Sequence, residues 1–202
     1  FFHFEVVISA EYPHKPPRVT LRTTDGGRVR FNPNLYACGK VCLSILGTWN
    51  GPAWSSACSL SSMLLSIQSL MSPKPYHNEP GYENHKDPVP IENYNDMIEH
   101  QVLRVAVCGM LENPTCNSAF STNMERHFLM WYKMYEDFAK TRQHLNGNHF
   151  KDPFKEGTGV FDYQTILARL EATRERLLAA IEEDSKMTDA DVASHPKGRN
   201  AL

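Results

Sequence analysis

The sequence predicts an α+β fold in which a short antiparallel β-meander comes first and only helices follow. Two observations lead to this prediction. Apolar and polar residues alternate in short runs before residue 32, as in half-buried strands, whereas from residue 59 onward apolar residues recur at helical spacing. Strands and helices that occupy separate stretches of a chain are typical of α+β domains. A chain of 202 residues, 41% of them hydrophobic, is long enough for one such domain with an extension.

The predicted strands lie at the start of the chain. Residues 1–9 have the β-branched and aromatic composition of a strand. The prolines of residues 12–17 then remove backbone donors and force an extended path outside any strand pairing. Residues 19–23 alternate as a second strand, and the turn signal at residues 25–27 leads into an extended stretch at residues 28–31. Because strands rarely open a domain so abruptly, we expect upstream elements that this chain lacks.

A one-sided helix is predicted over residues 59–72. Either Ser59 or Ser61 can cap its first turn, and Pro73 and Pro75 stop it. Its apolar residues follow the i, i+3, i+4, i+7 spacing; they are Leu60, Met63, Leu64, Ile67, Leu70 and Met71.

Three further segments have the apolar spacing of amphipathic helices, at about residues 93–112, 124–138 and 166–181. Residues 76–92, which precede the first of them, are rich in proline and predict a loop. From residue 184 the chain is polar and has no apolar periodicity, which predicts a disordered tail.

Composition excludes several classes of protein. The formal charge of −2 lacks the basic excess of nucleic-acid-binding proteins. No apolar run approaches the ~20 residues that a membrane-spanning helix needs. Five cysteines form an odd and scattered set, which argues against a disulfide framework. We therefore expect a protein of the cytoplasm and nucleus that binds neither nucleic acid nor membrane.

Cys38 and Cys42 lie four positions apart and allow several interpretations. A zinc site needs two further ligands at suitable spacing, and the other cysteines form no C-x2-C pair, so no metal site is predicted. A disulfide between the two is conceivable, although so short a loop is often strained. On composition alone, Cys42 is best explained as a small apolar residue packed in a core.

The surroundings of Cys42 change this interpretation. Cys42 follows the triplet Asn32-Pro33-Asn34, eight residues after Asn34. The order of motifs resembles the active site of ubiquitin-conjugating enzymes, and it runs through YPHKPP (12–17), CLSIL (42–46), WSSA (54–57) and the helix LLSIQSL (64–70). Within that family the Z-type members resemble it most, through GKVCLSILGTW (39–49), SIQSLM (66–71) and PYHNEPG (75–81). Large hybrid conjugating enzyme-ligases share FNPNLY and NEPGYE.

The resemblance implies the ubiquitin-conjugating (UBC) fold, an antiparallel β-meander with a crossover helix, here without the N-terminal helix and first strand. It implies an N-terminally truncated catalytic domain at residues 1–112 and a helical extension at residues 113–183, and residues 184–202 form the predicted tail. Two positions depart from the family pattern. Asn32 stands where the family usually has His, which removes a packing and hydrogen-bonding group, and Ser56 stands where it usually has Pro.

The resemblance also implies a reaction. Cys42 would accept ubiquitin or a ubiquitin-like modifier as a thioester and pass it to a substrate lysine, because a thiolate is both a strong nucleophile and a good leaving group. Asn34 would support the active-site loop or the oxyanion formed during lysine attack. Glu79 would orient or deprotonate the lysine, although a solvated loop carboxylate explains it equally well. His77 and Asn78 are weaker candidates for that role.

The implied partners are a ubiquitin-like modifier, an activating enzyme (the general one or the alternative one associated with Z-type members), a ubiquitin ligase and the substrate lysine. The chain itself would bind no cofactor, since ATP and magnesium are used by the activating enzyme. Two alternatives remain open, a catalytically silent ubiquitin-binding module of the same fold and a fragment of a large hybrid conjugating enzyme-ligase. Cys38 would be an incidental loop residue or a partner of Cys42 in a reversible disulfide.

Overall fold

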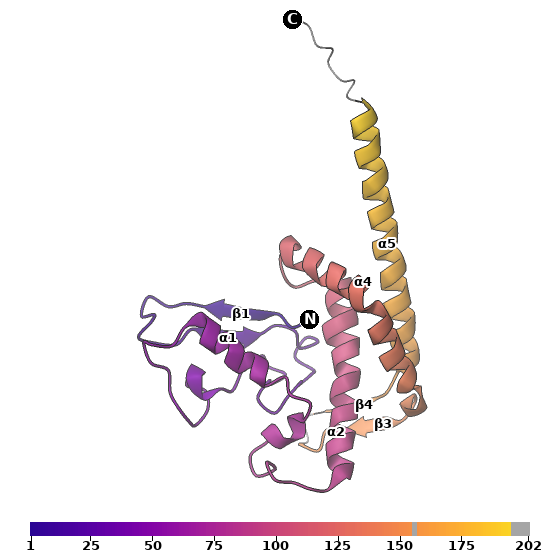
Figure 1. Ribbon diagram of the computed structural model, residues 1–202. Helices are drawn as coiled ribbons and strands as arrows, with labels where there is room; N and C mark the ends of the chain where they lie inside the picture. Colours follow the sequence, from indigo (N-terminus) through magenta and orange to yellow (C-terminus); the bar gives the residue numbers. More distant parts are fainter. Residues whose placement is uncertain (155–156, 195–202) are drawn as a thin grey trace, which may run out of the picture.

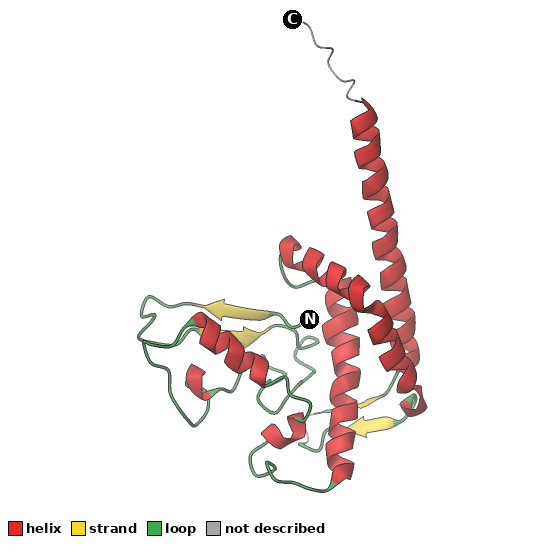
Figure 2. Cartoon of the chain, in the orientation of Figure 1, coloured by secondary structure: helices red, strands yellow, loops and turns green. Residues whose placement is uncertain are grey.

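A computed structural model of the chain describes residues 1–154 and 157–194. It confirms the α+β class, with small strand pairs set among helices (Figure 2). The strands β1 (Phe4–Val7) and β2 (Arg18–Leu21) and the helix α1 (Leu60–Ser69) form one side of the molecule (Figure 1). The long helices α4 (Ser118–Thr141) and α5 (Tyr163–Ser194) form the other side. The helix that begins with α2 runs between the two sides.

The predicted meander is reduced to one hairpin. Strand β1 (Phe4–Val7) pairs antiparallel with β2 (Arg18–Leu21), so that Phe4 lies opposite Leu21. Residues 28–31 form no strand, and three successive side chains there are buried, at positions 29–31. The preceding turn explains this difference: Asp25, Gly26 and Gly27 all have positive φ, and the amides of residues 28 and 29 both donate to the Thr24 carbonyl. This turn holds the chain to Thr24 instead of starting a ladder along β2.

Helix α1 (Leu60–Ser69) confirms the predicted crossover helix, and its cap is Ser59. The Ser59 hydroxyl accepts the Ser62 amide at 3.2 Å, and the Ser62 hydroxyl accepts the Ser59 amide at 2.9 Å, which is a reciprocal capping arrangement. Met63 and Ile67 are buried against the hairpin in the first core. Two short 3-10 helices flank α1, η1 (Ser44–Leu46) before it and η2 (Pro75–Asn78) after it.

One continuous helix joins the two sides of the molecule. It consists of α2 (Pro88–Gln101), a π-helical stretch η3 (Val102–Gly109) and α3 (Met110–Glu112). The sequence predicts its end correctly but starts it at residue 93. The earlier start follows from Asp87, whose carboxylate accepts the Val89 amide at 3.1 Å with proline at the first helical position. Opposite faces of η3 belong to different cores: Val105 and Ala106 pack in the first, and Leu103 and Val107 in the second.

The second core lies between this helix and the helices α4 (Ser118–Thr141) and α5 (Tyr163–Ser194). Along the chain, α4 is followed by η4 (Gln143–Leu145) and by a small antiparallel pair of strands, β3 (His149–Lys151) and β4 (Thr158–Val160), before α5 begins. The sequence does not predict these strands because each has only three residues. The helix α5 continues beyond Asp184, where the sequence predicts a disordered tail, because residues 184–194 contain no glycine or proline to end it. Residues 195–202 of that tail lie outside the described residues.

Among the described residues, no helix is both long enough and apolar enough to cross a membrane.

Candidate active site

Asn34 and Cys42 are held together by two hydrogen bonds. The Cys42 amide donates to the Asn34 carbonyl at 2.9 Å, and the Asn34 side-chain Nδ2 donates to the Cys42 carbonyl at 2.9 Å. An antiparallel bridge between Leu35 and Val41 closes the same loop one residue further in. The eight-residue spacing is therefore the length of a small closed loop, which brings the two predicted site residues into direct contact.

Asn32 joins this loop to two other elements. Its Oδ1 accepts the Asn34 amide at 2.9 Å and the Asn78 Nδ2 at 3.3 Å, and its Nδ2 donates to the Leu70 carbonyl at 2.9 Å. The residue is 2% exposed. The sequence predicts that asparagine at this position removes a hydrogen-bonding group. In the structure, however, Asn32 connects the loop of residues 34–42, here called the cysteine loop, to the end of α1 and to η2.

Thr48 is a supporting residue that the sequence analysis does not identify. Its hydroxyl donates to the Val41 carbonyl at 2.6 Å and accepts the Leu43 amide at 3.0 Å. These bonds hold the backbone on both sides of Cys42. The available signal is a hydroxyl residue directly after Gly47, which has φ +69° and ends η1.

The segment that contains Ser56 is tied to the proline-rich segment near the start of the chain. Trp54 donates its indole N–H to the Pro13 carbonyl at 2.7 Å, and the Ser56 hydroxyl lies 3.1 Å from Nδ1 of His14. Serine at position 56 therefore makes a polar contact that the usual proline could not make.

The Cys42 side chain is closed off from solvent in this structure, with the residue 1% exposed. Burial raises the pKa of its thiol, and the positive charges of Lys40 and Arg30 only partly oppose this rise. At neutral pH the thiol form therefore predominates. For this sulfur to act as the predicted nucleophile, the surrounding segments would have to open, because an attacking sulfur must reach its electrophile.

Glu79 forms an ion pair with Arg30, with Oε2 3.2 Å from Nη2. The Arg30 side chain is 5% exposed, and Nη2 also donates to the Pro33 carbonyl at 2.6 Å. Its guanidinium lies 4.3 Å from the centre of the Tyr36 ring. Glu79 thus balances a buried positive charge next to the Asn32–Asn34 loop. Its predicted role toward the lysine stays a prediction.

The remaining candidates have different surroundings. His77 donates from Nδ1 to the Tyr82 carbonyl at 2.9 Å, a contact within its own loop. Asn78 reaches Asn32, as described above, and is the better placed of the two. Cys38 is exposed and forms no disulfide. Within residues 1–154 and 157–194, no three histidine, cysteine or carboxylate side chains are grouped as a metal site would require.

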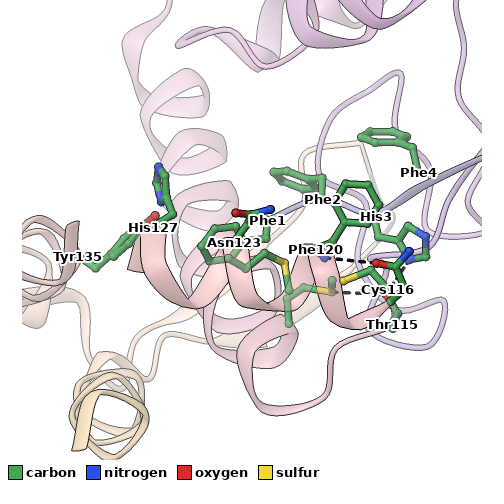
Figure 3. A pocket seen from close by; sticks show the side chains of 13 residues that line it. Phe1, Phe2, His3, Phe4, Thr115, Cys116, Phe120, Asn123, His127 and Tyr135 are labelled. Atoms are coloured by element: carbon green, nitrogen blue, oxygen red, sulfur yellow. Dashed lines mark hydrogen bonds between the residues drawn. The ribbon is translucent and has the colours of Figure 1, made fainter. Parts of the chain in front are cut away.

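A large cavity of about 710 Å³ lies elsewhere, between the first residues of the chain and α4 (Figure 3). Phe2, Phe120 and His127 are among the residues that line it, and none of Asn34, Cys42 and Glu79 does. The candidate active site is therefore a cluster of loop residues that lies apart from this cavity.

The chain is similar to known proteins along most of its length. Residues 1–99 match the family model described as ubiquitin-conjugating enzyme. The Danio rerio protein named ubiquitin-conjugating enzyme E2 Z is 54% identical over 178 residues, which are 88% of this chain and 54% of that protein. The Homo sapiens protein of the same name is 50% identical over 195 residues, 96% of this chain and 55% of that protein.

A more distant relative is the human dual E2 ubiquitin-conjugating enzyme/E3 ubiquitin-protein ligase BIRC6, 40% identical over 138 residues, which are 64% of this chain and 3% of that protein. The chain spans about half the length of the first two relatives. The sequence identity to these two proteins confirms the predicted resemblance to Z-type members. Together with the family match over the segment that carries Asn34, Cys42 and Glu79, it leads to one conclusion: the chain belongs to the ubiquitin-conjugating enzyme family.

Proposed function

We propose that this chain carries ubiquitin or a ubiquitin-like modifier as a thioester on Cys42 and transfers it to a substrate lysine. The observation that carries the proposal is the pair of hydrogen bonds between Asn34 and Cys42. An amide side chain, which has two N–H donors, thereby lies next to Cys42.

In the first step, the Cys42 thiolate attacks the thioester carbonyl of the modifier bound to its activating enzyme. A new bond forms between Cys42 Sγ and the carbonyl carbon, and the bond to the activating enzyme's sulfur breaks. That sulfur leaves as a thiolate and takes up a proton. ATP and magnesium are needed only to make the first thioester, in the activating enzyme.

In the second step, a neutral lysine amine attacks the carbonyl carbon, and a tetrahedral oxyanion forms. One N–H of Asn34 Nδ2 holds the Cys42 carbonyl in the resting geometry. Its second N–H is available to the oxyanion, which such donors stabilise by about 3 kcal/mol in other acyl-transfer enzymes. The carbon–sulfur bond then breaks, an amide bond remains, and the proton lost by the amine passes to a base. Glu79 is our candidate for orienting the amine.

The proposed partners are the modifier, an activating enzyme of the general or the alternative type, a ubiquitin ligase and the substrate protein. Five free cysteines fit a reducing compartment, and we place the protein in the cytoplasm and nucleus. The higher identity to the two Z-type relatives favours them over the hybrid enzyme-ligase as the nearer model of the whole protein.

A silent ubiquitin-binding module is the second candidate, and the burial and raised pKa of Cys42 are the observations in its favour. A charging assay decides between the two. The full-length protein is incubated with activating enzyme, modifier, ATP and magnesium, and the products are run on gels with and without reductant. An adduct that reductant removes, present in Cys38→Ala and lost in Cys42→Ala, supports the conjugating enzyme. No adduct with either the general or the alternative activating enzyme supports the binding module.

A further inference from the structure

Phe154, in the helical extension, reaches across to the loop that follows α1. It lies in the connection between β3 and β4, where its amide donates to Oδ1 of Asp152 at 2.8 Å. The Asp152 amide in turn donates to the Gly157 carbonyl at 2.8 Å, and Asp152 is 3% exposed. These bonds fix the start of the connection. The connection lies against α2, with η2 packed on the same helix (Figure 1).

The Phe154 ring packs among three tyrosines. Its centroid lies 5.2 Å from that of Tyr76, 5.4 Å from that of Tyr82 and 5.1 Å from that of Tyr94. All three distances fall in the range of favourable edge-to-face and tilted ring pairs. Tyr76 is 2% exposed and Tyr94 is fully buried. Phe154 therefore closes an aromatic cluster whose members come from η2, the following loop and α2.

Tyr76 connects this cluster to the candidate active site, because it belongs to η2 and lies two residues before Asn78. Asn78 donates to Oδ1 of Asn32, and Glu79 pairs with Arg30. Asn78 and Glu79, the last residue of η2 and its C-cap, thus lie two and three residues after Tyr76, which the aromatic cluster holds.

The contacts continue to Cys42 without a gap. Oδ1 of Asn32, which accepts from Asn78, also accepts the Asn34 amide. The Asn34 side chain donates to the Cys42 carbonyl at 2.9 Å. A shift of η2 would therefore change the bonds of Asn32 first and the position of the Asn34 amide group second.

We propose that Phe154 is a positioning residue for transfer of the modifier to lysine, an inference that rests on the function proposed above. Phe154 touches no reacting atom. It holds η2 in the position from which Asn78 and Glu79 support the cysteine loop. The helical extension is thereby a working part of the active site. Misplacement of catalytic groups by about 1 Å can cost about a hundredfold in rate, so a local change at Phe154 is expected to be measurable.

The first test uses Phe154→Leu in the full-length protein, since leucine keeps the apolar bulk but removes the ring. The protein is charged with modifier, the activating enzyme is quenched, and loss of the thioester to free lysine is followed in a single turnover. We expect charging to stay near that of the unsubstituted protein. Discharge to lysine should fall by about ten- to a hundredfold, and Phe154→Tyr, which keeps the ring, should restore it.

Phe161→Leu is the matched control. Phe161 is 6% exposed and packs on Phe150 and Tyr163, so its loss also weakens the helical extension, but the ring contacts none of the three tyrosines around Phe154. Thermal unfolding of both variants is measured in parallel. A discharge defect in Phe154→Leu that Phe161→Leu lacks supports positioning. Equal defects that follow the loss of stability, or normal discharge by Phe154→Leu, overturn it.

A second readout needs no activating enzyme. Hydrogen exchange of the peptide that covers residues 32–46 reports the Cys42 amide, which is bonded to the Asn34 carbonyl. We expect faster exchange in Phe154→Leu and unchanged exchange in Phe161→Leu. If the unsubstituted protein fails to charge, the proposed function is wrong, and exchange alone then decides whether Phe154 supports the loop: unchanged exchange in Phe154→Leu overturns that support as well.

Discussion

His100, in α2, makes the stability of the protein depend on pH. It is 2% exposed and is surrounded by the rings of Phe150, Phe161 and Tyr163. Its Nε2 accepts the Asp162 amide at 3.0 Å, so the neutral ring carries its proton on Nδ1, for which the described residues provide no acceptor. A second proton would place two N–H donors against each other in a buried site.

The pKa of His100 is lowered from its ordinary value of 6.5 to about 4, mainly by burial and also by the charge of Arg104, while Asp162 opposes the shift. Between these values the unfolded chain binds a proton at this position and the native protein does not, so stability rises with pH through this window. The stability contributed by the neutral His100 ring is complete above about pH 6.5 and is lost as the pH falls toward 4. At about 1.4 kcal/mol per pH unit, the full effect is about 3 kcal/mol, of which about 2 kcal/mol is lost by pH 5.

The assay is urea unfolding followed by tryptophan fluorescence at about pH 7, 6 and 5. In His100→Gln the side-chain carbonyl can accept the Asp162 amide but cannot be protonated. Between pH 7 and 5, the unsubstituted protein should lose about 2 kcal/mol more of its free energy of unfolding than His100→Gln does. His149→Gln, an exposed change in β3, should keep the original pH dependence. Identical pH dependence in the unsubstituted protein and His100→Gln would refute the reasoning.

Three further predictions concern the candidate active site. Asn34→Ala should charge but discharge to lysine about 10²- to 10³-fold more slowly in a single turnover; a defect confined to charging would contradict the oxyanion role. Glu79→Ala should lower the free energy of unfolding in urea by about 1–3 kcal/mol, because the buried Arg30 loses a carboxylate; an unchanged midpoint would show the ion pair to be unimportant. Iodoacetamide should modify the exposed Cys38 before the buried Cys42, whose raised pKa also slows alkylation. Mass spectrometry follows the alkylation of each cysteine over time, and faster alkylation of Cys42 would show that it is open in solution.

Local features of the fold could be predicted from sequence pattern. Apolar spacing and a capping serine set α1, and the same periodicity located the later helices, although not the start of α2 at Pro88. The spacing of Asn34 and Cys42 identified the candidate site through the family resemblance, and the structure shows that this spacing closes a small loop. These features are readable since the residues that form them are neighbours in the chain.

The contact partners of the site residues, in contrast, depend on how distant segments pack together. Asn32 forms hydrogen bonds with Leu70 and Asn78, and the Phe154 ring packs on Tyr76 and Tyr94. These residues are so far apart in the chain that no sequence periodicity predicts their contacts. The burial of Cys42, which raises its pKa, likewise depends on what packs over it. Side-chain packing and desolvation arise between elements that meet only after folding. For that reason the candidate residues of this site could be named from the sequence through the family resemblance, but the contacts that support them could not.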